Sequence, residues 1–455
     1  MIIKLDKVVE KLPPIFMTIY LYLKRSDIGT RMAKGSFWMF TGTAIGKFLV
    51  LVAGIIVANL LGKEKYGELG LVRSTINMFT IFGVAGMGMT ATKYISEFKN
   101  SNKSKVSSIY ILTNGFALFT GFLVSLVVFL MAPYLANNTL GAPYLVNEIK
   151  LGSLLLFIAV LNSAQLGVLS GFEDFKSIAI STFCASLAEL IFMILGAYYY
   201  GVIGALLGYG IGYLVTYISC FIFIKGNLNK YLIPISLKKL QTSDLKLLYK
   251  FSLPAALSSL MVGPIFWMAR TILANSSNGY AELGIYEAAD QWKVIILFIP
   301  TAISNVLLPI LSNTISEGKH KSYWTALKYN ILINASVAFM LASVISIFAK
   351  IIMNMYGDDF NEVSTLILVS FSTVFTSIAS VVGIAIASKG QMWVGFMFNS
   401  LWAIMFIYMT KLFISLDMGA FGLALALFCS YMLHTLFQLI YLLKLEKRVY
   451  GKKNY

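Results

Sequence analysis

The chain has 455 residues, of which 58% are hydrophobic and 12% charged, and its mean hydropathy is +0.79. This is too apolar for a water-soluble domain, in which about a quarter of the residues are charged. The formal net charge of +16 would suggest a nucleic-acid partner in a soluble protein, but here the Lys and Arg residues fall mainly in short segments between apolar runs. Positive-inside topology explains that distribution, so we predict an all-α polytopic membrane protein with no nucleic-acid partner.

Twelve apolar stretches are long enough to cross a bilayer as helices. A hydrocarbon core about 30 Å thick requires about 20 helical residues, and a helix satisfies its own backbone polar groups in lipid. The predicted spans are 37–61, 69–91, 109–136, 149–170, 178–199, 201–224, 251–273, 283–312, 327–351, 363–387, 391–413 and 419–443. A tight turn is required at residues 198–201, because a continuous helix there would invert every later span.

The longest polar connection follows the sixth span and is predicted to join two six-helix lobes. The predicted segments are a cytoplasmic N-terminal segment 1–36, an N-terminal lobe 37–224, a cytoplasmic linker 225–250, a C-terminal lobe 251–443 and a cytoplasmic tail 444–455. Basic residues concentrate in the first segment, the linker, the tail and the loops predicted on the same side. We therefore expect both ends of the chain in the cytoplasm.

The two lobes share a short sequence echo at the turn between their first and second spans. Ala58-Asn59, followed by YGELGL at 66–71, matches Ala274-Asn275, followed by YAELGI at 280–285. Six spans per lobe is an even number, so the halves are expected to share one orientation and to be related by an axis along the membrane normal. Two such bundles can rock about a site between them, which is the geometry of alternating access.

Ionisable residues within the spans mark the candidate site, because a charge at membrane depth is costly and usually faces a protein-lined or hydrated cavity. Lys47 has no local partner, whereas Asp290 and Lys293 are three residues apart and could neutralise each other. Arg73 and Arg270 could instead reach the external headgroups. We predict a central cavity in which the substrate-binding residues are Lys47, Arg73, Arg270 and Lys293, with Glu189 and Asp290 as candidates for ion coupling.

Motifs for enzymatic chemistry are missing from the sequence. Cys184, Cys220 and Cys429 lie in apolar stretches without metal-ligand spacing, and His320 and His434 form no ligand cluster. The pair at residues 46–47 lacks the first glycine and the following Ser or Thr of a phosphate loop. We therefore expect a protein that is not an enzyme and that has no metal and no cofactor.

Several motifs in and around the first two spans resemble those of a known family. They are GSFW at 35–38, VANLLG at 57–62, YGE at 66–68, GMG at 86–88 and ATKYISE at 91–97. Together they are similar to the polysaccharide biosynthesis transporters, which include the Wzx-type O-antigen flippases of the multidrug/oligosaccharidyl-lipid/polysaccharide exporter superfamily. The motif match covers mainly residues 35–100, whereas the plan of twelve spans covers nearly the whole chain.

The resemblance implies two lobes around a cationic cavity in a bacterial inner-membrane protein. It implies translocation of an undecaprenyl-diphosphate-linked oligosaccharide, such as the O-antigen unit of lipopolysaccharide, to the external leaflet. The implied partners are this lipid-linked oligosaccharide, membrane lipids, and the polysaccharide polymerase and glycosyltransferases of the same pathway. The cavity cations would then meet the sugar or the diphosphate.

Three alternative functions stay open at this point. A cation-coupled multidrug antiporter would rely on intramembrane carboxylates such as Glu189 and Asp290. A lipid II flippase of the same superfamily would be more typical with fourteen helices. A membrane polysaccharide polymerase would need a sizeable catalytic segment outside the membrane, and the predicted external loops are too short for one.

Overall fold

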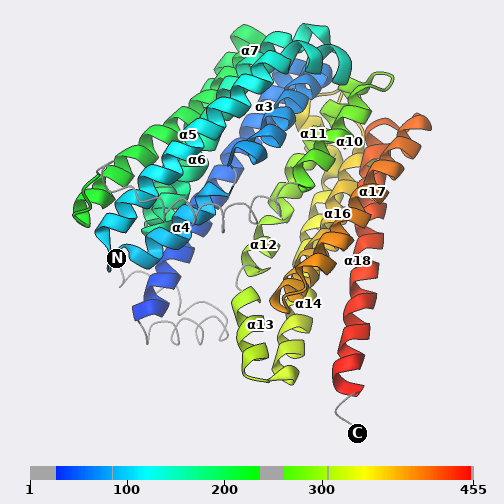
Figure 1. Ribbon diagram of the computed structural model, residues 1–455. Coiled ribbons are helices and arrows are strands. Elements are labelled where there is room, and N and C mark those ends of the chain that lie inside the picture. Colours follow the sequence, from blue (N-terminus) through cyan, green and yellow to red (C-terminus); the bar gives the residue numbers. More distant parts are fainter. Residues whose placement is uncertain (1–26, 85, 236–260, 305–306, 452–455) are drawn as a thin grey trace.

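The computed structural model describes residues 27–84, 86–235, 261–304 and 307–451, and this part of the chain is helical throughout, without strands. Two helical bundles lie side by side, one containing α3 to α7 and the other α10 to α18 (Figure 1). Most of the predicted N-terminal segment and of the predicted linker lies outside the described residues. The last helix of the first bundle continues to Lys230, beyond the predicted start of the linker at residue 225.

The N-terminal lobe consists of α3 (Asp27–Val84), α4 (Met87–Phe98), α5 (Lys103–Tyr134), η1 (Leu135–Thr139), η2 (Pro143–Leu145), α6 (Val146–Gly171) and α7 (Phe175–Lys230). Two of these helices are too long for one crossing, and each bends sharply. The bends are at Gly62 (φ 74°, ψ 166°) and Gly201 (φ 60°, ψ −136°), conformations that glycine adopts without a Cβ penalty. Each long helix therefore holds two spans, and the predicted turn at residues 198–201 is confirmed.

The C-terminal lobe consists of α10 (Val262–Ala274), α11 (Gly279–Ile296), α12 (Phe298–Ser304), α13 (Leu307–Ser316), α14 (His320–Ile347), α15 (Ala349–Tyr356), α16 (Val363–Ser388), α17 (Met392–Ser415) and α18 (Gly419–Gly451). The predicted span 283–312 is divided among three helices. Pro300 gives a physical reason for the first break, because a proline ring clashes with the carbonyl four residues earlier. That carbonyl belongs to Ile296, where α11 ends.

The helices account for about twelve membrane crossings. Eight described stretches are long and apolar enough to cross a membrane. Two of them contain the bends at Gly62 and Gly201 and supply two spans each, while α10 and the run from α11 to α13 supply the seventh and eighth. The fold is an all-α membrane protein with two pseudo-symmetric six-helix lobes around a central cavity, as predicted.

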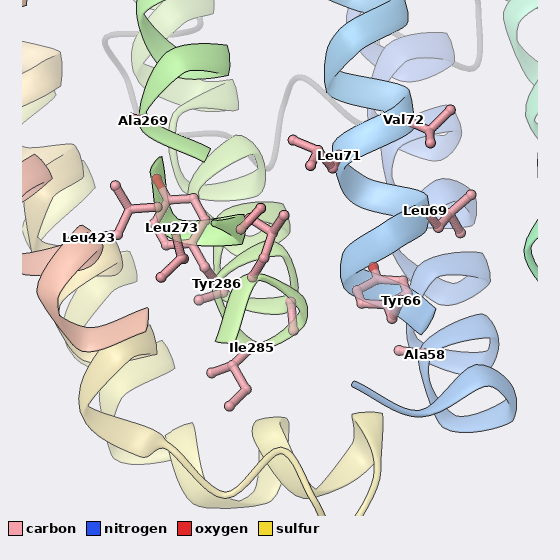
Figure 2. Packing of buried hydrophobic residues seen from close by; sticks show 14 of the residues in the cluster. Ala58, Tyr66, Leu69, Leu71, Val72, Ala269, Leu273, Ile285, Tyr286 and Leu423 are labelled. Atoms are coloured by element: carbon pink, nitrogen blue, oxygen red, sulfur yellow. The ribbon is translucent and has the colours of Figure 1, made fainter. Parts of the chain in front are cut away.

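Contacts between the lobes come mainly from α3, which packs on α10, α11 and α15. In Figure 2, Leu69 and Val72 on α3 point into the N-terminal lobe, while Leu273, Tyr286 and Leu423 gather inside the C-terminal lobe. We call the end of the molecule where α3 bends at Gly62 the joined end, and the end where α18 finishes the tail end. The joined end is at the top of Figure 1.

Two glycines allow the lobes to touch at the joined end. A Cβ placed on Gly67 would collide with the carbonyl oxygen of Tyr280, and a Cβ on Gly284 would collide with the carbonyl oxygen of Lys63. Small residues permit this kind of close backbone approach between membrane helices. The contact is reciprocal, and it falls within the two stretches that share the sequence echo.

Candidate functional site: a charged cavity between the lobes

A cavity of about 670 Å³ lies between the two lobes and is lined by α3, α7, α10 and α11. Its volume falls in the range typical of small-molecule sites. All four cations singled out from the sequence line it: Lys47, Arg73, Arg270 and Lys293. Two carboxylates, Glu287 and Asp290, also contribute to the lining.

The wall formed by the C-terminal lobe is an ion-paired cluster. Arg270 on α10 donates to Glu287 through Nε, and through Nη2 to Oδ2 of Asp290 at 2.9 Å. Lys293 pairs with the other oxygen of Asp290. The acidic and basic side chains of α11 are three residues apart and so share one helix face, on which Arg270 docks from the neighbouring helix. Two cations and two carboxylates balance, so this wall carries no excess charge.

The wall formed by the N-terminal lobe is different. Arg73 stacks over the ring of Tyr209, with its guanidinium carbon 4.4 Å from the ring centroid. Its nearest carboxylate is Glu189, with Nη2 and Oε1 separated by 3.9 Å. That separation is too long for a hydrogen bond, so the pair is held by charge alone. Glu189 is not among the residues that line the cavity.

Lys47 is the remaining cation of the cavity. It is half-buried on the first arm of α3, and among the described residues no carboxylate lies within ion-pair distance of its ammonium group. The hydroxyl residues Thr43, Thr182 and Ser186 share this part of the lining. With Arg73 balanced by Glu189 and the opposite wall neutral, Lys47 is the source of the net positive charge of the cavity.

At the joined end, a hydrogen-bonded group from both lobes borders the cavity; we call it the sealing group. Gln291 on α11 donates to the hydroxyl of Tyr66 on α3 and accepts from Tyr356 on α15 at 3.1 Å. Trp292 donates to the same Tyr356 hydroxyl, also at 3.1 Å. Tyr66 and Gln291 both line the cavity. The sealing group therefore forms part of the cavity wall.

Several lining residues were not among the predicted site residues. Glu287 is one helical turn before Asp290, and this spacing was the available signal for a second carboxylate on the same face. Gln291 and Tyr66 carry no charge, so a search for ionisable residues passes over them. Their role depends on contacts between distant helices, which periodicity along one helix cannot show.

Comparison with known proteins identifies the family. Residues 32–315 match the family described as "Polysaccharide biosynthesis protein". The EPS I polysaccharide export inner membrane protein EpsE of Ralstonia nicotianae is 26% identical over 201 residues, which are 43% of this chain and 45% of that protein. An uncharacterised membrane protein of Methanocaldococcus jannaschii is 27% identical over 297 residues, 62% of this chain and 68% of that protein. The chain thus aligns with less than half the length of EpsE.

Solved structures share the fold at low sequence identity. An inward-facing conformation of a multidrug resistance MATE family transporter of the MOP superfamily has a TM-score of 0.74 and 18% identity, covering 88% of this chain and 96% of that one. The outward-facing conformation has a TM-score of 0.65, covering 92% and 96%. A MOP superfamily transporter from Pyrococcus furiosus also has a TM-score of 0.65, with 17% identity, covering 93% and 98%.

The family match covers more than half of the chain, and the two lobes, the cavity and the sequence motifs agree with it. The resemblance predicted from the sequence is confirmed. This multi-pass membrane protein belongs to the family described as "Polysaccharide biosynthesis protein".

Proposed function

We propose that this protein carries a lipid-linked oligosaccharide with an anionic diphosphate from the cytoplasmic to the external leaflet of the membrane. The observation that carries the proposal is Lys47, which has no carboxylate partner among the described residues, in a cavity whose other charges are balanced. A mid-membrane lysine costs about 2.5–3.5 kcal/mol even on the milder insertion scale. An anionic ligand offsets that cost, and a cationic ligand increases it.

The charges of the cavity favour an anionic substrate over a cationic drug. A cation would need a free carboxylate, yet Glu287 and Asp290 are both held by Arg270. Glu189 lies near Arg73 and does not line the cavity. These pairings weigh against the cation-coupled drug antiporter. Undecaprenyl-diphosphate-linked sugar and lipid II share the diphosphate, so both remain compatible with the charge of the cavity.

The proposed orientation follows from the basic residues. Lys and Arg concentrate in the loops and tail at the tail end, and positive-inside topology places that end in the cytoplasm, together with both chain termini. The joined end then faces the exterior, where the group around Gln291 seals the cavity. In this orientation the molecule adopts the state that receives substrate from the cytoplasmic side.

Transport would then proceed by closing the cavity at the tail end and opening it at the joined end. The headgroup enters beside Lys47 and reaches Arg73 and the sealing group, while the polyprenyl tail stays in lipid. Separation of Gly67 from Gly284 opens the joined end and releases the headgroup outside. The cations need to attract the diphosphate without trapping it, and the paired carboxylates beside Arg270 and Lys293 limit the attraction at the outer part of the cavity.

The test is the initial rate of lipid-linked oligosaccharide translocation in vesicles containing the full chain. We expect Lys47→Ala to lower the rate about 10- to 100-fold, because a hydrogen bond to a charged group contributes about 1.5–3 kcal/mol. Lys47→Arg retains the charge and should retain more activity. Lys411→Ala is the matched control, since Lys411 is exposed on α17 and does not line the cavity. An unchanged rate for Lys47→Ala, at equal incorporation, would refute the proposal.

A further inference from the structure

A second, smaller cavity lies at the joined end, outside the seal of the main cavity. Its volume is about 340 Å³, and residues of both lobes line it. The polar and aromatic side chains of the lining are Glu64, Tyr144, Asn275, Ser276, Asn278 and Tyr280. We call this site the rim pocket.

Hydrogen bonds between the lobes frame the rim pocket. The side-chain amide of Asn275 donates to the carbonyl of Thr139 at 2.8 Å, and the hydroxyl of Tyr280 donates to the carbonyl of Leu140 at 2.8 Å. Both donors belong to the C-terminal lobe and both acceptors to the N-terminal lobe. The pocket in this form therefore exists only while the joined end is closed.

At the pseudo-symmetric position on the other side of the joined end, three aromatic side chains are buried. Asn59 and Asn275 have the same sequence separation as Gly141 and Gly357. The Asn59 amide lies 3.9 Å from the position of a Cβ on Gly357, and Gly141 faces Asn275 in the same manner. Beside Asn59, the aromatic side chains Tyr66, Tyr356 and Phe360 are 3%, 0% and 1% exposed. The rim pocket instead presents mainly polar side chains, so the two positions differ in chemistry although the fold relates them.

The chemistry of the rim pocket differs from that of the main cavity. None of the described residues that line it is Lys or Arg. The nearby ammonium of Lys65, 5.2 Å from the Tyr144 ring centroid, is paired with Glu68 at 2.8 Å. Amides, hydroxyls and one carboxylate can bond the hydroxyl groups of a neutral ligand, and the half-exposed ring of Tyr144 offers an apolar face for its C–H groups. These lining groups suit a sugar ring better than an anion.

We propose that the rim pocket is a binding site for an uncharged sugar ring, separate from the main cavity. A ligand there contacts both lobes and so favours the conformation in which the joined end is closed. The identification of the natural ligand as the sugar portion of an exported glycan rests on the proposed function. In that case exported glycan that accumulates outside slows further transport.

The test uses isothermal titration calorimetry of the full-length protein in nanodiscs with galactose and N-acetylglucosamine as probes, alongside calcium chloride and inorganic phosphate. We expect saturable binding of at least one sugar, weakened fivefold or more by Tyr144→Ala and by Ala281→Phe, which fills the pocket from α11. Tyr198→Ala is the matched control, because Tyr198 is an exposed tyrosine near the Gly201 bend that does not line the pocket. The unfolding temperature of each variant reports its folding.

The outcomes separate this proposal from the proposed function. Sugar affinity should be the same in Lys47→Ala as in the parent, even if that variant transports normally. The rim-pocket proposal is overturned if neither sugar binds saturably, or if sugar affinity is unchanged in both Tyr144→Ala and Ala281→Phe. It is also overturned if calcium or phosphate alone binds in a manner that depends on Tyr144.

Discussion

The two walls of the main cavity hold cations in opposite ways. On the C-terminal wall, Arg270 and Lys293 are tied to Glu287 and Asp290 by direct ion pairs. On the N-terminal wall, Arg73 has only a distant carboxylate and Lys47 has none among the described residues. Both walls present two cations, so counting cations alone would rank them equally. From this difference in pairing we propose that the C-terminal wall mainly stabilises the lobe, while the N-terminal wall keeps charge available for a ligand.

The largest expected effect is loss of stability when the paired wall is broken. Arg270→Ala leaves Glu287 and Asp290 without their shared cation, and removing one partner of a buried pair costs about 3–5 kcal/mol. We expect a markedly lower unfolding temperature for Arg270→Ala in detergent. The triple variant with Glu287→Gln and Asp290→Asn should recover much of the loss. If Arg270→Ala unfolds at the parental temperature, this wall is not the stabilising one.

The next largest effect is expected at the joined end, where Gly67 brings the two lobes into contact. Gly67→Ala places a methyl group against the carbonyl of Tyr280, and overpacking of this kind costs about 1–3 kcal/mol. The closed joined end should be less populated, so spin labels at Lys103 and Glu317 near the tail end should report shorter distances. Gly115→Ala is the control, because open space surrounds Gly115 on α5. Equal distance distributions in both variants would contradict the claim that the contact between Gly67 and α11 closes the joined end.

A second substitution that compensates for the loss of Lys47 tests the difference between the two walls. Asp290→Asn should release Lys293 while Arg270 keeps Glu287, which makes the C-terminal wall resemble the N-terminal one. In a Lys47→Ala background, we expect this second substitution to restore translocation about tenfold. The reason is that a free cation returns to the same cavity. A double variant no faster than Lys47→Ala would mean that the position of Lys47, and not its charge, is the functional property.

The smallest effect on the translocation rate is expected for Glu189, the partner of Arg73. Glu189→Gln removes the partner that Arg73 holds at 3.9 Å, and the ring of Tyr209 still supports the guanidinium. We expect translocation within about threefold of the parental rate, because a weak, long pair contributes at most about 1 kcal/mol. The antiporter alternative makes the opposite prediction, since a coupling carboxylate cannot be neutralised without loss of transport. Rates measured at several proton gradients decide between them.

Most of the fold followed from hydropathy, because membrane spans must be long and must satisfy their own backbone. The turn at Gly201 was predicted for the same reason. Hydropathy could not show the break after Ile296, since an apolar stretch stays apolar through a kink. Pro300 was the local signal for it. Likewise, the sequence echo located the joined end, but only the packing of α3 on α11 shows that Gly67 and Gly284 touch.

The charged lining of the cavity was predictable as a set of residues but not as a set of pairs. The cost of charge in a membrane selects Lys47, Arg73, Arg270 and Lys293 without any structure. The partner of Arg270 depends on how α10 docks on α11 across a turn, which spacing along one helix cannot determine. Lys47 was the favourable case, since a lysine with no carboxylate one turn away was already expected to lack a local partner.

The central claim is that Lys47 gives the cavity its preference for an anionic lipid. The most direct test is equilibrium binding of farnesyl diphosphate and of uncharged farnesol to the full chain in nanodiscs. We predict that the parent and Lys47→Arg prefer the diphosphate by at least about tenfold, and that Lys47→Ala binds the two lipids with similar affinity. A Lys47→Ala variant that keeps the parental preference for the diphosphate would contradict the account.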